Sequence, residues 1–84
     1  MERSFYYPVS WSTVREYKKL LDEKEIPYEI QSSTDLPLLE EGQLAIVFPS
    51  LPNRTYVWVR TLFSRDGHAY PDEATLFFHH LSKN

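Results

Sequence analysis

Cysteine is absent from this chain of 84 residues. Without a thiol the chain can form no disulfide framework, no thiolate-bound zinc site and no cysteine nucleophile. A small domain that folds without disulfides is typical of a reducing compartment. The sequence therefore predicts a cytoplasmic protein.

Glycine and long hydrophobic runs are also scarce. The only two glycines, Gly42 and Gly67, stand far apart, which excludes a glycine-rich phosphate-binding loop. No stretch approaches the roughly 18 apolar residues that a membrane span needs. The first residues lack the basic region followed by an apolar region that marks a secretory signal. We therefore predict no contact with a membrane.

Residue patterns that carry catalysis or bind metals are missing as well. The histidines are His68, His79 and His80, and adjacent residues on a helix point about 100° apart, whereas helical metal ligands need a spacing of four. There is no G-x-S-x-G nucleophile elbow. Acidic pairs such as Asp22 and Glu23 are neighbours in sequence, an arrangement typical of a solvated surface. We predict neither an enzyme, nor a cofactor, nor a metal site.

Aromatic residues are abundant, at 15% of the chain. A chain of this length forms one domain, residues 1–84, and buries only about 60 to 65% of its unfolded surface. Large rings that each bury about 150 to 250 Å² can compensate for the small core.

The longest run of β-branched and aromatic residues covers 54–63 and contains neither Gly nor Pro. Such a run favours a strand. One face of that strand carries Tyr56, Trp58 and Arg60, and the other carries Val57, Val59 and Phe63. We expect the second face to pack on helices and the first to be open to a partner, since interfaces favour Tyr, Trp and Arg.

The flanking segments complete an α+β fold. Thr13 and Glu16 predict a capping box at the start of a helix whose apolar stripe includes Trp11. The predicted order is β-α-β-β-β-α, with a four-stranded mixed or antiparallel sheet and two helices packed on one face. The expected elements are strands at 4–7, 26–30, 43–48 and 54–63, with the last two paired as a hairpin, a parallel unit of the first two strands, and helices near 13–24 and 72–81.

Charge is unevenly distributed. Residues 16–41 contain eight acids and three lysines. The connection 31–42 within this segment is long for so small a domain, and binding residues gather on such loops. Its acids Asp35, Glu40 and Glu41 can steer a basic partner, and Leu38 can add an apolar anchor. The alternative is that the acids serve solubility and the loop leucines cap the core.

These patterns predict a small protein-interaction module, an adaptor or inhibitor of the kind common among bacterial and phage regulators. It would bind another protein that has a basic surface, or a second copy of itself, without catalysis. Two alternatives remain open. One is a single-stranded nucleic-acid binder that uses Tyr56, Trp58 and Arg60, although the net charge of −3 opposes phosphate. The other is a small-ligand sensor.

Overall fold

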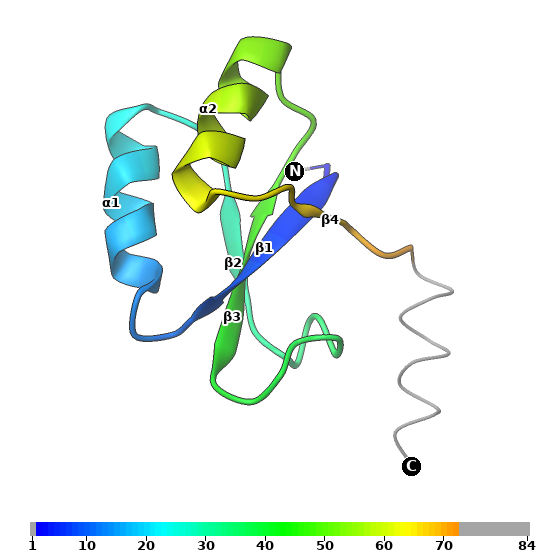
Figure 1. Ribbon diagram of the computed structural model, residues 1–84. Coiled ribbons are helices and arrows are strands. Elements are labelled where there is room, and N and C mark those ends of the chain that lie inside the picture. Colours follow the sequence, from blue (N-terminus) through cyan, green and yellow to red (C-terminus); the bar gives the residue numbers. More distant parts are fainter. Residues whose placement is uncertain (1, 73–84) are drawn as a thin grey trace.

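The computed structural model describes residues 2–72. It confirms an α+β domain with a four-stranded sheet and two helices (Figure 1). The predicted helix at 72–81 lies almost wholly outside the described residues. The observed elements are β1 (Phe5–Ser10), α1 (Val14–Glu23), β2 (Glu29–Gln31), β3 (Gln43–Phe48), α2 (Asn53–Phe63) and β4 (His68–Ala69).

The predicted order β-α-β-β-β-α is wrong at its fifth element, because the run 54–63 is the helix α2, and the prediction missed β4, which supplies the fourth strand of the sheet. The same residues also carry a helical stripe, with Val59 and Phe63 buried four positions apart. A helix has to bury only that stripe, whereas a strand would have to bury two apolar faces. Val57, which we expected in the core, is therefore 58% exposed.

The sheet has the strand order β2-β3-β1-β4 and is antiparallel throughout. The predicted hairpin between 43–48 and 54–63 is therefore wrong, since β3 pairs with β1 and β2 instead. β1 and β2 run in the same direction but are separated by β3. The element order β-α-β-β-α-β is that of the split βαβ, or ferredoxin-like, arrangement.

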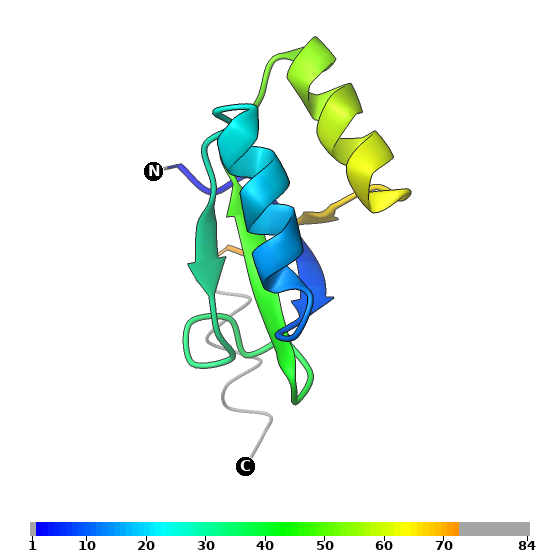
Figure 2. The ribbon, with the colours of Figure 1, turned by 90° about the vertical axis from the view of Figure 1, so that its left-hand side faces the viewer.

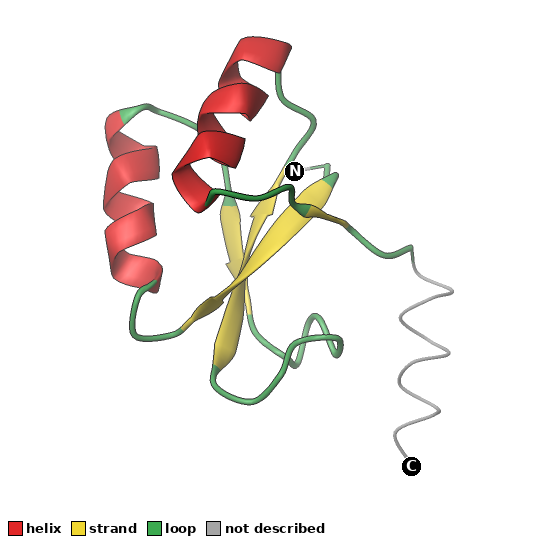
Figure 3. Cartoon of the chain, viewed as in Figure 1, coloured by secondary structure: helices red, strands yellow, loops and turns green. Residues whose placement is uncertain are grey.

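Both helices cover one face of the sheet (Figure 2). Because side chains alternate along a strand, β1 sends Phe5, Tyr7 and Val9 into the helical core and Tyr6 to the opposite face. The connection between β2 and β3 covers that opposite face, as Figure 3 shows. Its apolar cluster contains Tyr6, Leu36, Leu39, Ala45 and Val47.

Pro8 lies inside β1, where we expected it to end the strand. β4 pairs only with Phe5 and Tyr6, so no strand requires an N–H donor from Pro8 on that side. The Pro8 carbonyl instead accepts a hydrogen bond of 2.8 Å from Nη2 of Arg65.

The helix α1 begins after the predicted cap residue, Thr13, but the predicted capping box does not form. The Thr13 hydroxyl donates a hydrogen bond of 3.1 Å to the Ser10 carbonyl instead of accepting one from the helix. At the other end Glu25 has a φ of 56°, and the Ile26 amide bonds the Leu21 carbonyl at 3.0 Å. The chain reverses its direction at this turn and continues into β2.

Gly67 marks the tightest approach of a loop to the core. A Cβ on this residue would lie 2.8 Å from Cδ2 of Phe5 and 3.1 Å from Cε2 of Tyr7. Both rings belong to the helical core and have little room to move. We expect Gly67→Ala to lower the free energy of unfolding by about 1 to 3 kcal/mol, the usual cost of overpacking. Urea denaturation measures this change, and an unchanged midpoint would show that the rings yield freely.

Candidate partner-binding surfaces

The three residues predicted to share an open sheet face do not lie together. Tyr56 and Trp58 are about 200° apart around α2 and therefore occupy opposite flanks of the helix. The Tyr56 ring meets Phe5 edge-on at 5.2 Å between centroids, and Arg60 is ion-paired with Asp66 on the same flank. The prediction of a single contact face made by Tyr56, Trp58 and Arg60 is therefore wrong.

The predicted loop residues, by contrast, do share one segment. The β2–β3 connection buries Leu36 and Leu39 against the sheet, so part of the core-capping interpretation is correct. Leu38, which lies between them, is 38% exposed. Asp35, Glu40 and Glu41 are exposed along the same loop.

Hydrogen bonds hold this loop in shape. The Leu36 amide donates to the Ser32 carbonyl at 2.9 Å, and the Leu39 amide donates to the Leu36 carbonyl at 3.1 Å. At the far end, the Glu40 amide donates to Oε1 of Gln43 at 3.0 Å. Local bonds and two buried leucines therefore fix the acidic side chains on a rigid base.

A polar network supports the start of the loop. Gln31 is buried, and its Nε2 donates a hydrogen bond of 2.9 Å to Oε1 of Glu29, which is also ion-paired with Arg3. The hydroxyl of Tyr70 donates to Oε1 of Gln31 at 2.8 Å, and the Arg3 guanidinium lies 5.9 Å from the Tyr70 ring centroid. The buried amide is thus satisfied at both ends, which favours a single position for the strand from which the loop leaves.

Trp11 is another residue that sequence reasoning misplaced. We expected it in the apolar stripe of the first helix, but it precedes the cap residue Thr13 and is 68% exposed. Its amide donates a hydrogen bond of 3.1 Å to the Gly42 carbonyl, which places Trp11 next to the end of the acidic loop. The sequence did contain a signal for this exposure, because Trp11 precedes the cap residue. A residue outside the helix need not follow the helical stripe.

We call Trp11, Asp35, Leu38, Glu40 and Glu41 the acidic loop surface. None of its three carboxylates forms an ion pair with any residue in the described part of the chain. Within residues 2–72, the surface therefore combines carboxylates that have no ion-pair partner with two exposed apolar side chains.

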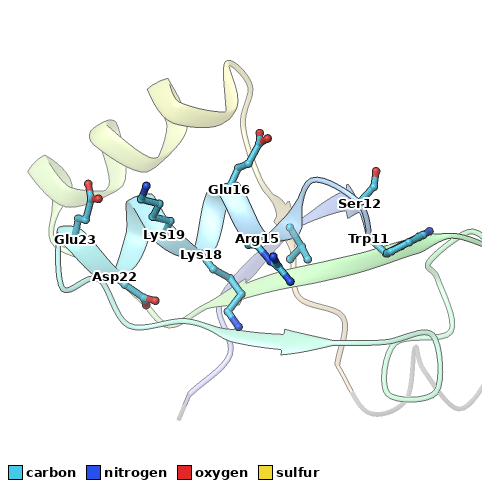
Figure 4. Close-up of a pocket in the computed structure, with 9 residues that line it drawn as sticks. Trp11, Ser12, Arg15, Glu16, Lys18, Lys19, Asp22 and Glu23 are labelled. Atoms are coloured by element: carbon cyan, nitrogen blue, oxygen red, sulfur yellow. The ribbon is translucent and has the colours of Figure 1, made fainter.

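The outer face of α1 does not continue this acidic surface. Figure 4 shows Arg15 and Lys18 on the flank that faces β2, with Lys19, Glu16 and Glu23 pointing the other way. These side chains and Trp11 border a shallow depression of about 880 Å³. Three acids and three bases line it, so the negative charge of 16–41 is concentrated on the loop.

Asp22 on the same helix is engaged by a neighbour. The Tyr28 hydroxyl donates a hydrogen bond of 2.8 Å to Oδ1 of Asp22. Burial, followed by this hydrogen bond, raises the pKa of Tyr28 to about 12. The contact joins the end of α1 to the start of β2.

A second depression, of about 340 Å³, lies between the end of α1 and the start of α2. We call it the basic groove. The Nζ of Lys24 lies 5.4 Å from the centroid of the Trp58 ring. Sequence reasoning missed this groove because it placed Trp58 on a strand and counted Lys24 within an acidic segment. Its lining residues are Lys24, Ile26, Arg54, Thr55 and Trp58.

Within residues 2–72, no helix has the length and apolar character that crossing a membrane requires.

Comparison with other proteins adds no assignment to these two surfaces. No protein-family model, curated protein or solved structure matches the chain.

Proposed function

We propose that this protein is an interaction module, an adaptor or inhibitor without catalytic activity, which binds a basic partner protein through the acidic loop surface. The observation that carries the proposal is the split of the loop leucines. Leu36 and Leu39 pin the loop to the sheet, while Leu38 is exposed among acids that form no ion pair within residues 2–72, and the Trp11 amide bonds the Gly42 carbonyl at the end of the same loop.

This arrangement suits recognition energetically. Tryptophan, with tyrosine and arginine, is enriched among the residues that contribute most of the binding energy in protein interfaces. Exposed carboxylates accelerate encounter with an oppositely charged surface. Because the loop is already ordered, little conformational entropy is lost when a partner binds. The loop thus combines exposed charge with an ordered backbone, and an exposed tryptophan adjoins its end.

The two alternative functions have less support. The nucleic-acid alternative depended on Tyr56, Trp58 and Arg60 lying on a sheet, and they lie on α2. The exposed Trp11 cannot readily replace them, because the neighbouring Glu40 and Glu41 repel phosphate. A sensor would be expected to enclose most of its ligand, whereas the depression along α1 is lined mainly by exposed side chains.

The test uses Asp35→Asn, Glu40→Gln and Glu41→Gln combined. Surface charges contribute under about 1 kcal/mol each to stability, so the melting temperature should stay nearly unchanged. The association rate with a nuclease-resistant partner, recovered by the wild-type protein from lysate, should fall, and its salt dependence should flatten. Stopped-flow or surface-based kinetics at several salt concentrations measure both.

The matched control removes the same charge elsewhere, with Glu2→Gln, Glu16→Gln and Glu23→Gln combined. In addition, Trp11→Ser should weaken binding by about tenfold or more, while Val57→Ser, at an exposed site on α2, should not. Equal rates and salt slopes for the loop variant and the wild type would place the partner site elsewhere.

A further inference from the structure

The basic groove is a local reversal of charge in an acidic protein. The chain has a net charge of −3, yet no acidic residue of the described chain lines the groove, which contains both Lys24 and Arg54. Neither cation forms an ion pair with another residue in 2–72. Their charge is therefore available to a partner.

Apolar and aromatic surface lies between the two cations. Ile26, which is largely buried, and Trp58, which is half-buried, both line the groove. The Lys24 ammonium lies over the Trp58 ring. This cation–π contact favours a side-chain conformation that keeps the ammonium at the groove. The hydroxyl of Thr55 adds a hydrogen-bonding group.

We infer that the basic groove binds a short acidic segment of a partner protein. Carboxylates of the segment pair with Lys24 and Arg54, and an apolar side chain packs on Ile26 and the Trp58 indole. The guanidinium of Arg54 suits this role because its fork of donors can hold a carboxylate at two points.

The charges around the groove favour a peptide over a nucleic acid. Two cations match a few carboxylates, whereas a polynucleotide gains affinity by neutralising many phosphates. Glu23 and Glu25 flank Lys24 in sequence and are exposed, and they repel a long polyanion.

The groove lies at the opposite end of the domain from the acidic loop surface. In Figures 1 and 2 the end of α1 and the start of α2 lie at the top, and the β2–β3 loop lies at the bottom. The two surfaces can therefore be occupied together, and the groove inference does not depend on the proposed function of the loop.

The experiment follows Trp58 fluorescence in the full chain with Trp11→Phe, which leaves one tryptophan. The probe is the peptide acetyl-Glu-Glu-Leu-Glu-Glu-amide, and its matched neutral form has Gln for every Glu. At low salt we expect saturable binding of the acidic probe, and at least about tenfold weaker binding of the neutral one.

Variants then locate the site. Lys24→Gln with Arg54→Gln should weaken binding of the acidic probe by about tenfold or more. The control Arg15→Gln with Lys18→Gln removes the same charge from the other flank of α1 and should change binding by less than about twofold. Circular dichroism melts confirm that both double variants are folded.

Three results would overturn the inference. The first is the absence of saturable binding, or equal affinities of the wild-type groove and the Lys24/Arg54 variant. The second is tighter binding of a short oligothymidine than of the peptide, which would make the groove a nucleic-acid site. The third is a dimer in sedimentation that only the groove variant loses, because the occupant would then be a second copy of the chain.

Discussion

Phe63→Ala is expected to lower the free energy of unfolding by about 3 to 5 kcal/mol. The Phe63 ring stacks on Tyr7 with 4.0 Å between centroids and on Tyr17 with 4.5 Å. It thereby connects α2 to the central strand β1 and to α1. Truncation would leave a cavity between three elements that cannot all close around it.

This loss is large for so small a domain. Stabilities of about 0.05 to 0.15 kcal/mol per residue give roughly 4 to 12 kcal/mol for a chain of this length. We therefore expect Phe63→Ala to be partly unfolded in the absence of denaturant if the wild-type stability lies at the low end of that range. Urea denaturation followed by circular dichroism measures the difference.

Val57→Ala provides the control within the same helix. Its side chain is exposed, so truncation should change the stability by no more than about 0.5 kcal/mol. Similar losses for both variants would mean that the helix is sensitive to truncation in general, and that the aromatic stack contributes nothing particular.

Phe63 also shows how far the sequence alone leads. Its burial was predicted correctly, because a large aromatic residue at the end of an apolar run belongs to the core in either a strand or a helix. The type of element was predicted wrongly, because we expected a strand where the structure has the helix α2. Tyr56, Val59 and Phe63 fit a helical spacing while the whole run has strand propensity, and such propensities are overridden by tertiary context.

The other elements were predictable to different degrees. Thr13 at the start of α1, the strand at 43–48 and the loop at 31–42 all followed from local signals that tertiary packing did not oppose. The hairpin prediction failed because it depended on the strand at 54–63. Once that run is a helix, β3 takes β1 as its partner, a pairing between segments distant in sequence that no local pattern specifies.

The candidate surfaces divide in the same way. The exposure of the loop was predictable, because turn residues and charge mark an exposed loop directly. The residues concerned are Asp35, Leu38, Glu40 and Glu41. The exposure of Trp11 was signalled by its position before the cap residue but was missed. The pairing of Lys24 with Trp58 was not predictable, since it depends on where one helix ends and another begins in space. A contact between two helices is invisible until both are known to be helices.

The loop leucines allow a second large effect to be tested within three positions of sequence. Leu36 is fully buried in the cluster that also contains Tyr6 and Val47. We expect Leu36→Ala to lower the free energy of unfolding by about 2 to 5 kcal/mol, the range for a buried leucine. Leu38→Ala should cost less than about 1 kcal/mol, because Leu38 is partly exposed.

The direct effects on partner binding should be the reverse of the effects on stability, with Leu38 contributing and Leu36 not. Leu38→Ala should weaken the complex with the basic partner proposed above while leaving the folded loop intact, since its side chain belongs to the acidic loop surface. Leu36→Ala weakens binding only through the position of the loop, and an added excess of the basic partner should therefore restore part of its lost stability. Urea denaturation with and without the partner measures both effects.

Amide hydrogen exchange shows where the Leu36 cavity acts. If the loop detaches from the sheet by itself, amides of the loop, including those of Leu36 and Leu39, should lose protection while those of β3 keep it. In that case Leu36→Ala should lower the free energy of global unfolding by less than the range for a buried leucine, because the open loop no longer holds a cavity. If β3 loses protection equally, the loop is part of the cooperative core. Unchanged exchange in both segments, with an unchanged urea midpoint, would contradict the role of Leu36 as the residue that pins the acidic loop.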